Sequence, residues 1–540
     1  MRVLSPSSRR LVLSLALVSG LGVSAGMSQS WAFSSKDGVE VDLQFDGRVV
    51  LPTPYLVEAE DDKPEETKLR TPQEQVEKQL KFLSGAFQFN PIKGGRRVDD
   101  SATITRQDEK YIHYHYQGKA LLEKNVGSTY DFVLPFDPQN IATIAKAGAE
   151  INPCTDPHYA SDADFFYFFN PTRSGCHLKN GVDYFKVAAK LTRLPESPIT
   201  YPDYSRLIDK NGEITIHVLQ GKNKDTSNPH PKWSFDVAAK EFRSFSSYLR
   251  KQGFSDRRLS ETEIRRFLTD AGVKEGDFKK IMARYGQLPF IREYEKKEGG
   301  VKVKVRFFYG TVSADGDSAP LHAFWKDALE NASVAIYNGH SGLGGNLDLK
   351  SIEKELGEFQ VDGNRYQIWV LDGCSTYTYY QEPYFNLKGR DLKGVNPRNN
   401  LQILSTGLES DFRYNSLTAQ PLVNAILAHL RNQAVPSWKS LIQVMSHDNL
   451  LSVAGDEMSP QTPDGRYLVR PIPLEAVRSN LNVPSAPTFI LPSELAPMIV
   501  EPAPAEMESA LDSGSDAQEA ATPALERAPA EPAEMNPNSG

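Results

Sequence analysis

The sequence predicts an α/β protein in which a mostly parallel sheet, covered by helices on both sides, follows a β-rich N-terminal domain. Two observations predict this fold class. Beyond about residue 206, short apolar runs that suit strands buried on both faces alternate with amphipathic helical patterns. The earlier residues instead contain runs with the period of two that is typical of half-buried strands. We place the N-terminal domain at 33–205 and the α/β domain at 206–475.

Composition excludes several classes of protein. The chain has 540 residues, of which 39% are hydrophobic and 24% are charged, as in ordinary globular proteins. Its formal net charge of −8 arises in residues 501–540, which carry nine acidic side chains and a single basic one. The rest of the chain is balanced, so we expect no nucleic-acid partner. Residues 476–540 are rich in Pro, Ala and Glu and are predicted to form a disordered acidic tail.

The first residues have the pattern of a secretory signal peptide. Arg2, Arg9 and Arg10 precede an apolar run over 11–21, and small residues that suit a cleavage site follow it. That run is shorter than the roughly 20 residues of a spanning helix, and no later segment is apolar for so long, so we expect no integral membrane span. We predict that residues 1–32 are removed and that the mature protein is secreted or periplasmic.

The N-terminal domain is expected to contain one helix among its strands. Thr71 as N-cap, Pro72 in the first turn and Glu74 three residues after the cap are the start signals of a helix over 72–87. We interpret the aromatic run at 165–169 as a core strand. Further strands are predicted over 39–43, 111–116 and 130–134.

In the α/β domain, strands and helices are expected to alternate. The strand predicted over 301–307 buries one face, because apolar residues alternate there with Lys and Arg. Functional residues of such folds lie beyond the carboxyl ends of the parallel strands. The other expected strands are 214–219, 334–337, 368–371 and 401–404, and the helices are 234–250, 321–329, 350–356 and 417–431.

Three cysteines are too few for a disulfide-dense scaffold. Cys154 and Cys176 bracket the aromatic run, and in an oxidising compartment they would close a loop of about 22 residues, a crosslink worth roughly 3 kcal/mol in the chain-entropy model. The alternative is that one of them pairs with Cys374. If the first pairing holds, Cys374 is left as a free thiol.

Two strand ends carry reactive side chains. His340 follows the apolar run 334–337 in a glycine-rich loop, and Cys374 follows the apolar run 368–371. One crossover helix fits between the two strands, which would make them neighbours. A thiolate is a nucleophile, and a nearby imidazole favours it or carries its proton. The backbone N–H groups of Ser341 and Cys374 are candidate donors to a developing oxyanion.

This pattern resembles the caspase-like cysteine peptidases, which include caspases, metacaspases, gingipains and clostripain relatives. The segment Tyr-Asn-Gly-His ending at His340 looks like the metacaspase histidine loop, and Asp-Gly-Cys-Ser around Cys374 looks like the Asp-x-Cys block. The resemblance implies a caspase-like three-layer sandwich in which Cys374 attacks a peptide carbonyl and His340 protonates the leaving amine. It also implies an oxyanion site formed by backbone at Ser341, Gly342 and Gly373.

The sequence departs from that family in two places. Ser341 stands where the family usually has glycine, and the Gln-Ala-Cys-x-Gly signature of caspases is absent. Cleavage preference is left open by the sequence. Glu409 and Asp411, beyond the run 401–404, would suit a basic substrate residue, whereas Arg413 would suit an acidic one.

The sequence therefore predicts a caspase-like cysteine endopeptidase that acts on a protein or peptide substrate with a Cys–His dyad. The alternative is a non-catalytic caspase-like binding protein of the envelope or the extracellular space, and a third possibility is a hydrolase of non-peptide amides or esters. We expect no cofactor. His113 and His115 share one strand face, but no third ligand is recognisable, so no metal site is predicted.

Overall fold

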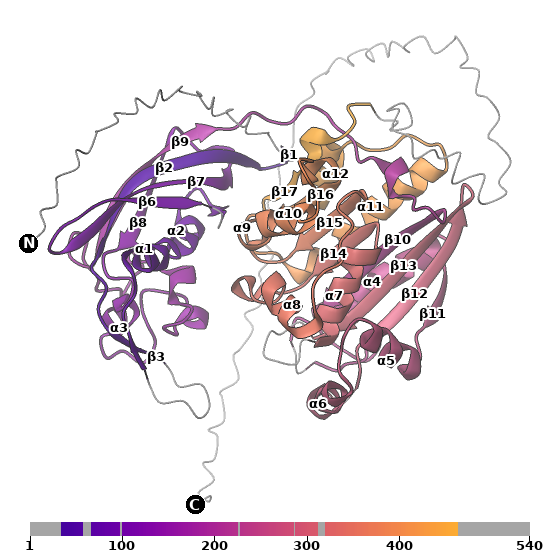
Figure 1. The fold of residues 1–540 in the computed structure, drawn as a ribbon, viewed down its shortest axis with the longest axis horizontal. Coiled ribbons are helices and arrows are strands. Elements are labelled where there is room, and N and C mark those ends of the chain that lie inside the picture. Colours follow the sequence, from indigo (N-terminus) through magenta and orange to yellow (C-terminus); the bar gives the residue numbers. More distant parts are fainter. Residues whose placement is uncertain are drawn as a thin grey trace, which may run out of the picture. The chain divides into compact units, whose positions relative to one another are not determined.

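Two large β-sheets, one of nine strands and one of six, organise the computed structural model (Figure 1). The predicted signal peptide at 1–32 and the predicted tail at 476–540 lie outside the described residues. No helix of the described part is long and apolar enough to cross a membrane. The structure describes residues 34–57, 66–97, 100–224, 227–285, 287–311 and 319–462.

The nine-stranded sheet has a parallel centre and antiparallel edges. Its order is β1-β17-β16-β15-β14-β10-β13-β12-β11. The strands from β16 to β13 run parallel, whereas β17 and β1 extend one edge and β12 and β11 the other in antiparallel pairing. The strands are β1 (Ser34–Ser35), β10 (Glu213–Gly221), β11 (Ser255–Arg258), β12 (Phe290–Glu298), β13 (Val301–Gly310), β14 (Val334–Asn338), β15 (Gln367–Asp372), β16 (Leu401–Thr406) and β17 (Leu451–Ala454).

The sequence pattern indicates a parallel or mixed sheet, and the described part of this sheet is evenly mixed rather than mostly parallel. Four of its pairings are parallel and four are antiparallel. β12 was not predicted from the sequence, because its charged residues do not resemble a buried strand. A two-residue turn at Gly299 and Gly300, both with positive φ, joins β12 to β13. Such turns suit the twist of a hairpin and favour glycine.

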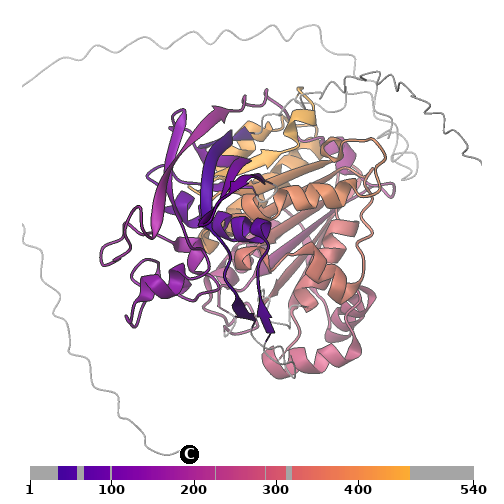
Figure 2. The same ribbon diagram turned by 60° about the vertical axis from the view of Figure 1, so that its left-hand side comes forward.

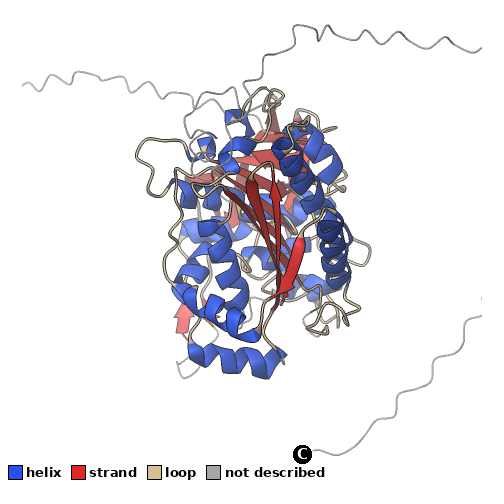
Figure 3. Cartoon of the chain, turned by 90° about the vertical axis from the view of Figure 1, so that its right-hand side faces the viewer, coloured by secondary structure: helices blue, strands red, loops and turns tan. Residues whose placement is uncertain are grey.

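Helices cover both faces of the nine-stranded sheet, which Figure 3 shows edge-on. Neighbouring residues of the central strands alternate between two cores: Ile336 and Val370 enter one, Tyr337 and Leu371 the other. These strands are therefore buried on both sides, as predicted. In two views, α5 and α6 lie beside the β11–β12 edge (Figures 1 and 2). The first core packs against α4 (Val237–Lys251), α11 (Asn415–Leu430) and α12 (Trp438–Met445), and the second against α5 (Glu261–Asp270), α6 (Glu275–Tyr285), α7 (Ala319–Asn331), α8 (Leu349–Leu356) and α10 (Gln381–Gly389).

The six-stranded sheet is antiparallel and has its own core. Its order is β5-β7-β2-β9-β8, with β6 also paired to β7. A short β3–β4 pair (Tyr55–Val57 and Glu66–Lys68) stands apart from it. The three strands predicted in this region are confirmed. The elements are β2 (Gly38–Val50), β5 (Gly94–Arg96), β6 (Ser101–Gln107), β7 (Tyr111–Glu123), β8 (Thr129–Pro135) and β9 (Tyr184–Arg193), with α1 (Pro72–Leu80), α2 (Leu83–Phe89) and α3 (Ile141–Lys146).

Two local predictions in this region are corrected. Thr71 and Glu74 form the expected capping box, but the helix predicted over 72–87 is two helices, since the chain turns between α1 and α2. The turn brings Phe82 edge-on to Phe169, with ring centroids 5.2 Å apart. The aromatic run is not a strand: Phe165–Phe168 is a 3-10 helix whose rings pack against Phe82 and against Phe89 of α2. Buried aromatic residues suit a strand or a 3-10 helix equally well, so composition did not distinguish these two structures.

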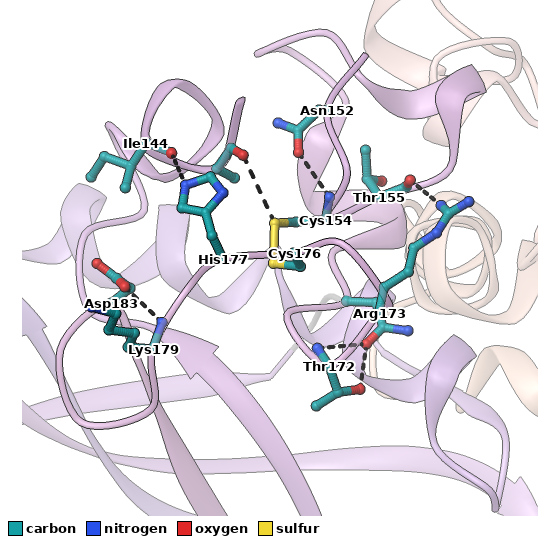
Figure 4. The surroundings of a disulfide bond; sticks show 12 residues. Ile144, Asn152, Cys154, Thr155, Thr172, Arg173, Cys176, His177, Lys179 and Asp183 are labelled. Carbon is teal, nitrogen blue, oxygen red and sulfur yellow. Dashed lines mark hydrogen bonds between the residues drawn. A yellow bond between two sulfur atoms is a disulfide. The ribbon is translucent and has the colours of Figure 1, made fainter. Parts of the chain in front are cut away.

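Cys154 and Cys176 form the predicted disulfide (Figure 4). Cys374 is a free cysteine. The alternative pairing with Cys374 is therefore wrong. A hydrogen bond holds the start of the loop that the disulfide closes: the Asn152 side chain accepts from the Cys154 N–H at 3.0 Å. The crosslink fixes the ends of the segment that carries the 3-10 helix.

A buried carboxyl lies where the first described strand meets the last. Asp456 has no exposed surface, and its Oδ2 accepts a hydrogen bond from Ser34 Oγ at 2.8 Å. Burial, and then the neighbouring Glu457, raise the pKa of Asp456 to about 8. The folded protein therefore keeps this carboxyl protonated at neutral pH.

Replacing Asp456 by Asn is expected to change how stability depends on pH. Between about pH 4 and pH 8 the folded state holds a proton that the unfolded state releases, so this group lowers stability as pH rises, by up to about 1.4 kcal/mol per pH unit. In Asp456→Asn, the free energy of unfolding should fall less than in the wild type between pH 5 and pH 8. Urea denaturation over that range measures the difference. Parallel curves for the two proteins would contradict the assignment.

Candidate active site

The pairing of β14 with β15 brings the two predicted catalytic residues to the same edge of the sheet. The strands are parallel neighbours, and their last paired residues are Asn338 and Asp372. His340 and Cys374 each lie two residues beyond that pair. The sequence prediction that these two strand ends are neighbours is therefore confirmed. Adjacent strands lie about 4.8 Å apart.

Two glycines allow the backbones to approach beyond the strand ends. The Gly339 N–H donates to the Asp372 carbonyl at 3.1 Å, which extends the strand pairing by one step. A Cβ on Gly373 would lie 2.5 Å from the Gly339 carbonyl oxygen. A larger residue at position 373 would therefore push the loops that carry His340 and Cys374 apart.

The Cys374 segment is held on its other side by β16. Thr376 Oγ1 donates to the Leu371 carbonyl at 2.6 Å and accepts from the Thr406 N–H at 2.9 Å. Ser375, which follows the thiol, has a φ of +53°. This left-handed conformation costs a non-glycine residue on the order of 1 kcal/mol, and such strain gathers at functional sites. Ser375 leads into the short helix α9 (Thr376–Tyr379).

The imidazole of His340 is exposed, and its orientation fixes its tautomer. Nε2 lies 3.0 Å from the carbonyl oxygen of Asn223. A carbonyl can only accept, so Nε2 carries a proton, and in the neutral imidazole Nδ1 then holds the lone pair. The ring packs against Phe412 with centroids 4.8 Å apart. Nδ1 is thus the nitrogen that can receive a proton.

Two carbonyl groups of the loop that carries His340 are already bonded. The His340 carbonyl accepts from Asn346 Nδ2 at 2.7 Å, and the Ser341 carbonyl accepts from Tyr380 Oη at 2.7 Å. In a trans peptide the N–H points opposite to the C=O, so the N–H groups of Ser341 and Gly342 point away from these partners. Their role as oxyanion donors stays a prediction.

A buried carboxylate, Asp372, connects the site to α11. Its side chain is 3% exposed and accepts from Thr418 Oγ1 at 2.7 Å, from Asn415 Nδ2 at 3.1 Å and from the Ser410 hydroxyl. Asn415 in turn accepts from Gln220 Nε2 at 3.0 Å. This network joins the ends of β10 and β15. The sequence analysis gave Asp372 no role, although its place at a buried strand end was a usable signal.

The surroundings of Cys374 disfavour its charged form. The residue is half-buried, and burial raises the pKa of its thiol to about 11. Burial is the largest cause of this raised pKa, the nearby Glu409 and Asp372 also contribute to it, and the Ser410 backbone opposes it. The resting thiol is therefore protonated at neutral pH, and an attack by sulfur requires a base that removes its proton.

Part of the disulfide-closed loop lies against this segment. Tyr167 of the 3-10 helix lies with its hydroxyl oxygen 3.2 Å from Ser375 Oγ, and both residues are buried. Tyr159 packs on Tyr167 with ring centroids 5.0 Å apart. Burial raises the pKa of both tyrosine hydroxyls. The contact with Ser375 places Tyr167 next to the residue that follows the thiol. Sequence reasoning missed this contact because it joins residues about 200 positions apart.

The three candidate specificity residues have different surroundings. Asp411 caps a 3-10 helix and accepts from Arg413 Nε at 2.7 Å, so these two side chains neutralise each other. Glu409 directly follows Leu408, whose carbonyl accepts from the Ser375 N–H at 2.9 Å. It is exposed, yet enough protein surrounds its carboxyl that burial raises its pKa.

The two histidines of β7 do not share a ligand. His113 Nε2 bonds Asp108 at 2.8 Å, and His115 Nδ1 bonds Asp46 at 2.8 Å. Among the described residues, no group of three His, Cys, Asp or Glu side chains could hold a metal ion.

The chain matches no protein-family model, no curated protein sequence and no solved structure. An interpretation of this site therefore depends on its own geometry and on the motif resemblance.

Alkylation of Cys374 tests the electrostatics of the site without assuming any activity. Cys374 is the single free thiol, so iodoacetamide reports on it alone. A pKa of about 11 rather than 9 should make the rate at pH 8 about a hundredfold lower than for an unhindered thiol, rising tenfold per pH unit up to pH 10. The urea-unfolded protein is the control. A rate that levels off below pH 8 would contradict the assignment.

Proposed function

We propose that this protein is a cysteine endopeptidase in which Cys374 is the nucleophile and His340 carries the proton. The register of β14 and β15 supports this proposal most directly. Both residues lie two positions beyond the last residue pair of the two strands, Asn338 and Asp372. The resemblance of both loops to the caspase-like peptidases points the same way. We further propose the caspase-like fold for residues 206–475, on the support of helices that cover both faces of a sheet with a parallel centre.

The proposed reaction follows from the protonation states. As sulfur attacks the substrate carbonyl carbon, the thiol proton passes to Nδ1 of His340, which is free to accept it because Nε2 donates to Asn223. The resulting oxyanion would be bonded by the backbone N–H groups of Ser341 and Cys374, the donors expected from the sequence. The C–N bond then breaks as the imidazolium protonates the leaving amine, and water hydrolyses the thioester to restore the thiol.

The proposed location is the periplasm or the extracellular space. The disulfide between Cys154 and Cys176 supports this, since such bonds persist in oxidising compartments. The proposed substrate is a protein or peptide.

A second candidate function is that of a non-catalytic binding protein with the same architecture. The half-buried Cys374 and its raised pKa favour it, because a buried thiol is a common inert core residue. In that case the surface of the six-stranded sheet would bind the partner, and Cys374 would not react with substrate-like probes.

Cleavage of a peptide library distinguishes the two candidates. The secreted wild type should cleave it, Cys374→Ala should abolish cleavage, and His340→Ala should reduce kcat/KM by about a hundredfold or more, because positioned proton transfer contributes that much. His115→Ala is the matched control, since His115 bonds Asp46 on a different sheet. Absence of cleavage by folded wild type, together with no labelling of Cys374 by peptidyl acyloxymethyl ketones, would exclude the peptidase.

A further inference from the structure

The loop between β10 and α4 exposes two aromatic side chains. The ring of Phe235 is fully exposed and Trp233 is 61% exposed. Of the large apolar side chains in the described part of the chain, Phe235 is the most exposed. A single exposed apolar residue is normal on a protein surface, whereas two aromatic rings on one short loop form an apolar surface that favours contact with another molecule.

The backbone that carries these rings is held from inside the protein. Asp236 is buried and caps α4 by accepting from the Ala238 N–H at 2.7 Å. The same carboxylate accepts from the Lys224 N–H and from Ser227 Oγ, each at 2.8 Å. Ser234 is also buried, so a buried residue stands on each side of Phe235. The exposure of the rings is therefore a feature of a well-bonded loop.

The side chains next to the rings are positively charged. Lys232 is exposed, and its Nζ lies 4.4 Å from the centre of the Trp233 ring. On the other side, His230 packs edge-on against Phe290 with ring centroids 4.8 Å apart. Arg258 Cζ lies 4.6 Å from the centre of that same Phe290 ring. A lysine and an arginine thus lie beside the loop.

The described carboxylates of this segment do not offset that charge at the surface. Asp236 is bonded within the loop, and Glu241 is buried and accepts from Ser416 Oγ at 2.5 Å. All exposed charged residues in the described part of 222–241 are lysines. Together with the two rings they form a basic aromatic patch, which consists of Lys224, Lys232, Trp233, Phe235 and Lys240.

We propose that the basic aromatic patch binds the surface of a membrane that contains anionic lipids. Aromatic rings enter the boundary between head groups and acyl chains, and lysines beside them are attracted to the negative charge of the lipid surface. This charge complementarity favours an anionic lipid surface. A second copy of this chain is disfavoured, because a symmetric contact through the patch would bring its lysines together.

Membrane binding through this patch would also orient the candidate site. The same loop contains Asn223, whose carbonyl accepts from His340 Nε2 at 3.0 Å. β10 is a parallel neighbour of β14, so the loop leaves the sheet at the edge where His340 and Cys374 lie. The edge that carries the candidate site would therefore face the bilayer. The binding itself does not depend on peptidase activity.

Flotation with lipid vesicles tests the proposal on the full secreted chain. The wild type should float with vesicles of phosphatidylcholine and phosphatidylglycerol in equal parts, and less as ionic strength rises. Replacing both Trp233→Ser and Phe235→Ser should weaken this binding by about tenfold or more, because burial of an aromatic ring contributes that much. Lys232→Glu should weaken it by about tenfold as well, and vesicles of phosphatidylcholine alone should bind the wild type poorly.

Two matched controls separate the patch from general effects of polarity and charge. Val182 is 68% exposed in the turn before β9, and Val182→Ser removes a similarly exposed apolar side chain. Lys297 pairs with Lys302 at the start of β13, which is the opposite end of the large sheet from the loop. Val182→Ser and Lys297→Glu should both bind the anionic vesicles as the wild type does.

Fluorescence quenching by brominated lipids locates the ring in the bilayer. Trp325, Trp369 and Trp438 are fully buried, so quenching in the vesicle-bound protein should come from Trp233. Trp233→Phe keeps an apolar ring, so this variant should still bind while the quenching is lost.

Three results would overturn the proposal. They are a folded wild type that binds no anionic vesicles, full binding by the variant that lacks both rings, and quenching that persists in Trp233→Phe. A dimer that forms without lipid and is lost when both rings are replaced, in protein that binds no vesicles, would assign the patch to a second copy instead. Thermal unfolding of each variant confirms that the fold is intact.

Discussion

The parallel pairing of β14 with β15 is the constraint on which the candidate site depends. The two strands are buried on both faces, so neither can slip by one residue without turning its apolar side chains into the wrong layer. Their register is therefore fixed by the packing of both helical layers. The positions of His340 and Cys374 follow from that register, with Gly339 and Gly373 permitting the close approach of the backbones.

Rigidity around the thiol has an electrostatic cost. The same contacts that hold the Cys374 segment, from β16, from α11 through Asp372 and from Tyr167, also remove the thiol from water. Burial and two carboxylates then favour the protonated thiol. Chemistry at such a site depends on a base that takes the proton during attack, rather than on a resting thiolate. In the proposed mechanism, Nδ1 of His340 would be that base, because Nε2 bonds to the Asn223 carbonyl.

The region that contains the six-stranded sheet contributes directly to this edge of the large sheet. Tyr377 donates to the buried Glu40 at 2.7 Å, and Arg97 pairs with Glu382 at 2.6 Å. These bonds join β2 and the segment after β5 to α9 and α10. The disulfide-closed loop lies against Ser375 in the same way. The N-terminal region therefore helps to shape the surroundings of Cys374.

The sequence by itself determined the features that depend on local pattern: the buried central strands, the capping box at Thr71, the disulfide, and the two strand-end residues His340 and Cys374. These follow from periodicity, spacing and local hydrogen bonding, which act over a few residues. Tertiary structure alone decided the antiparallel edges, the 3-10 form of the aromatic run, the pairing of Asp411 with Arg413, and the contact of Tyr167 with Ser375. Those features arise from contacts between distant segments, whose energies depend on packing that no local pattern records.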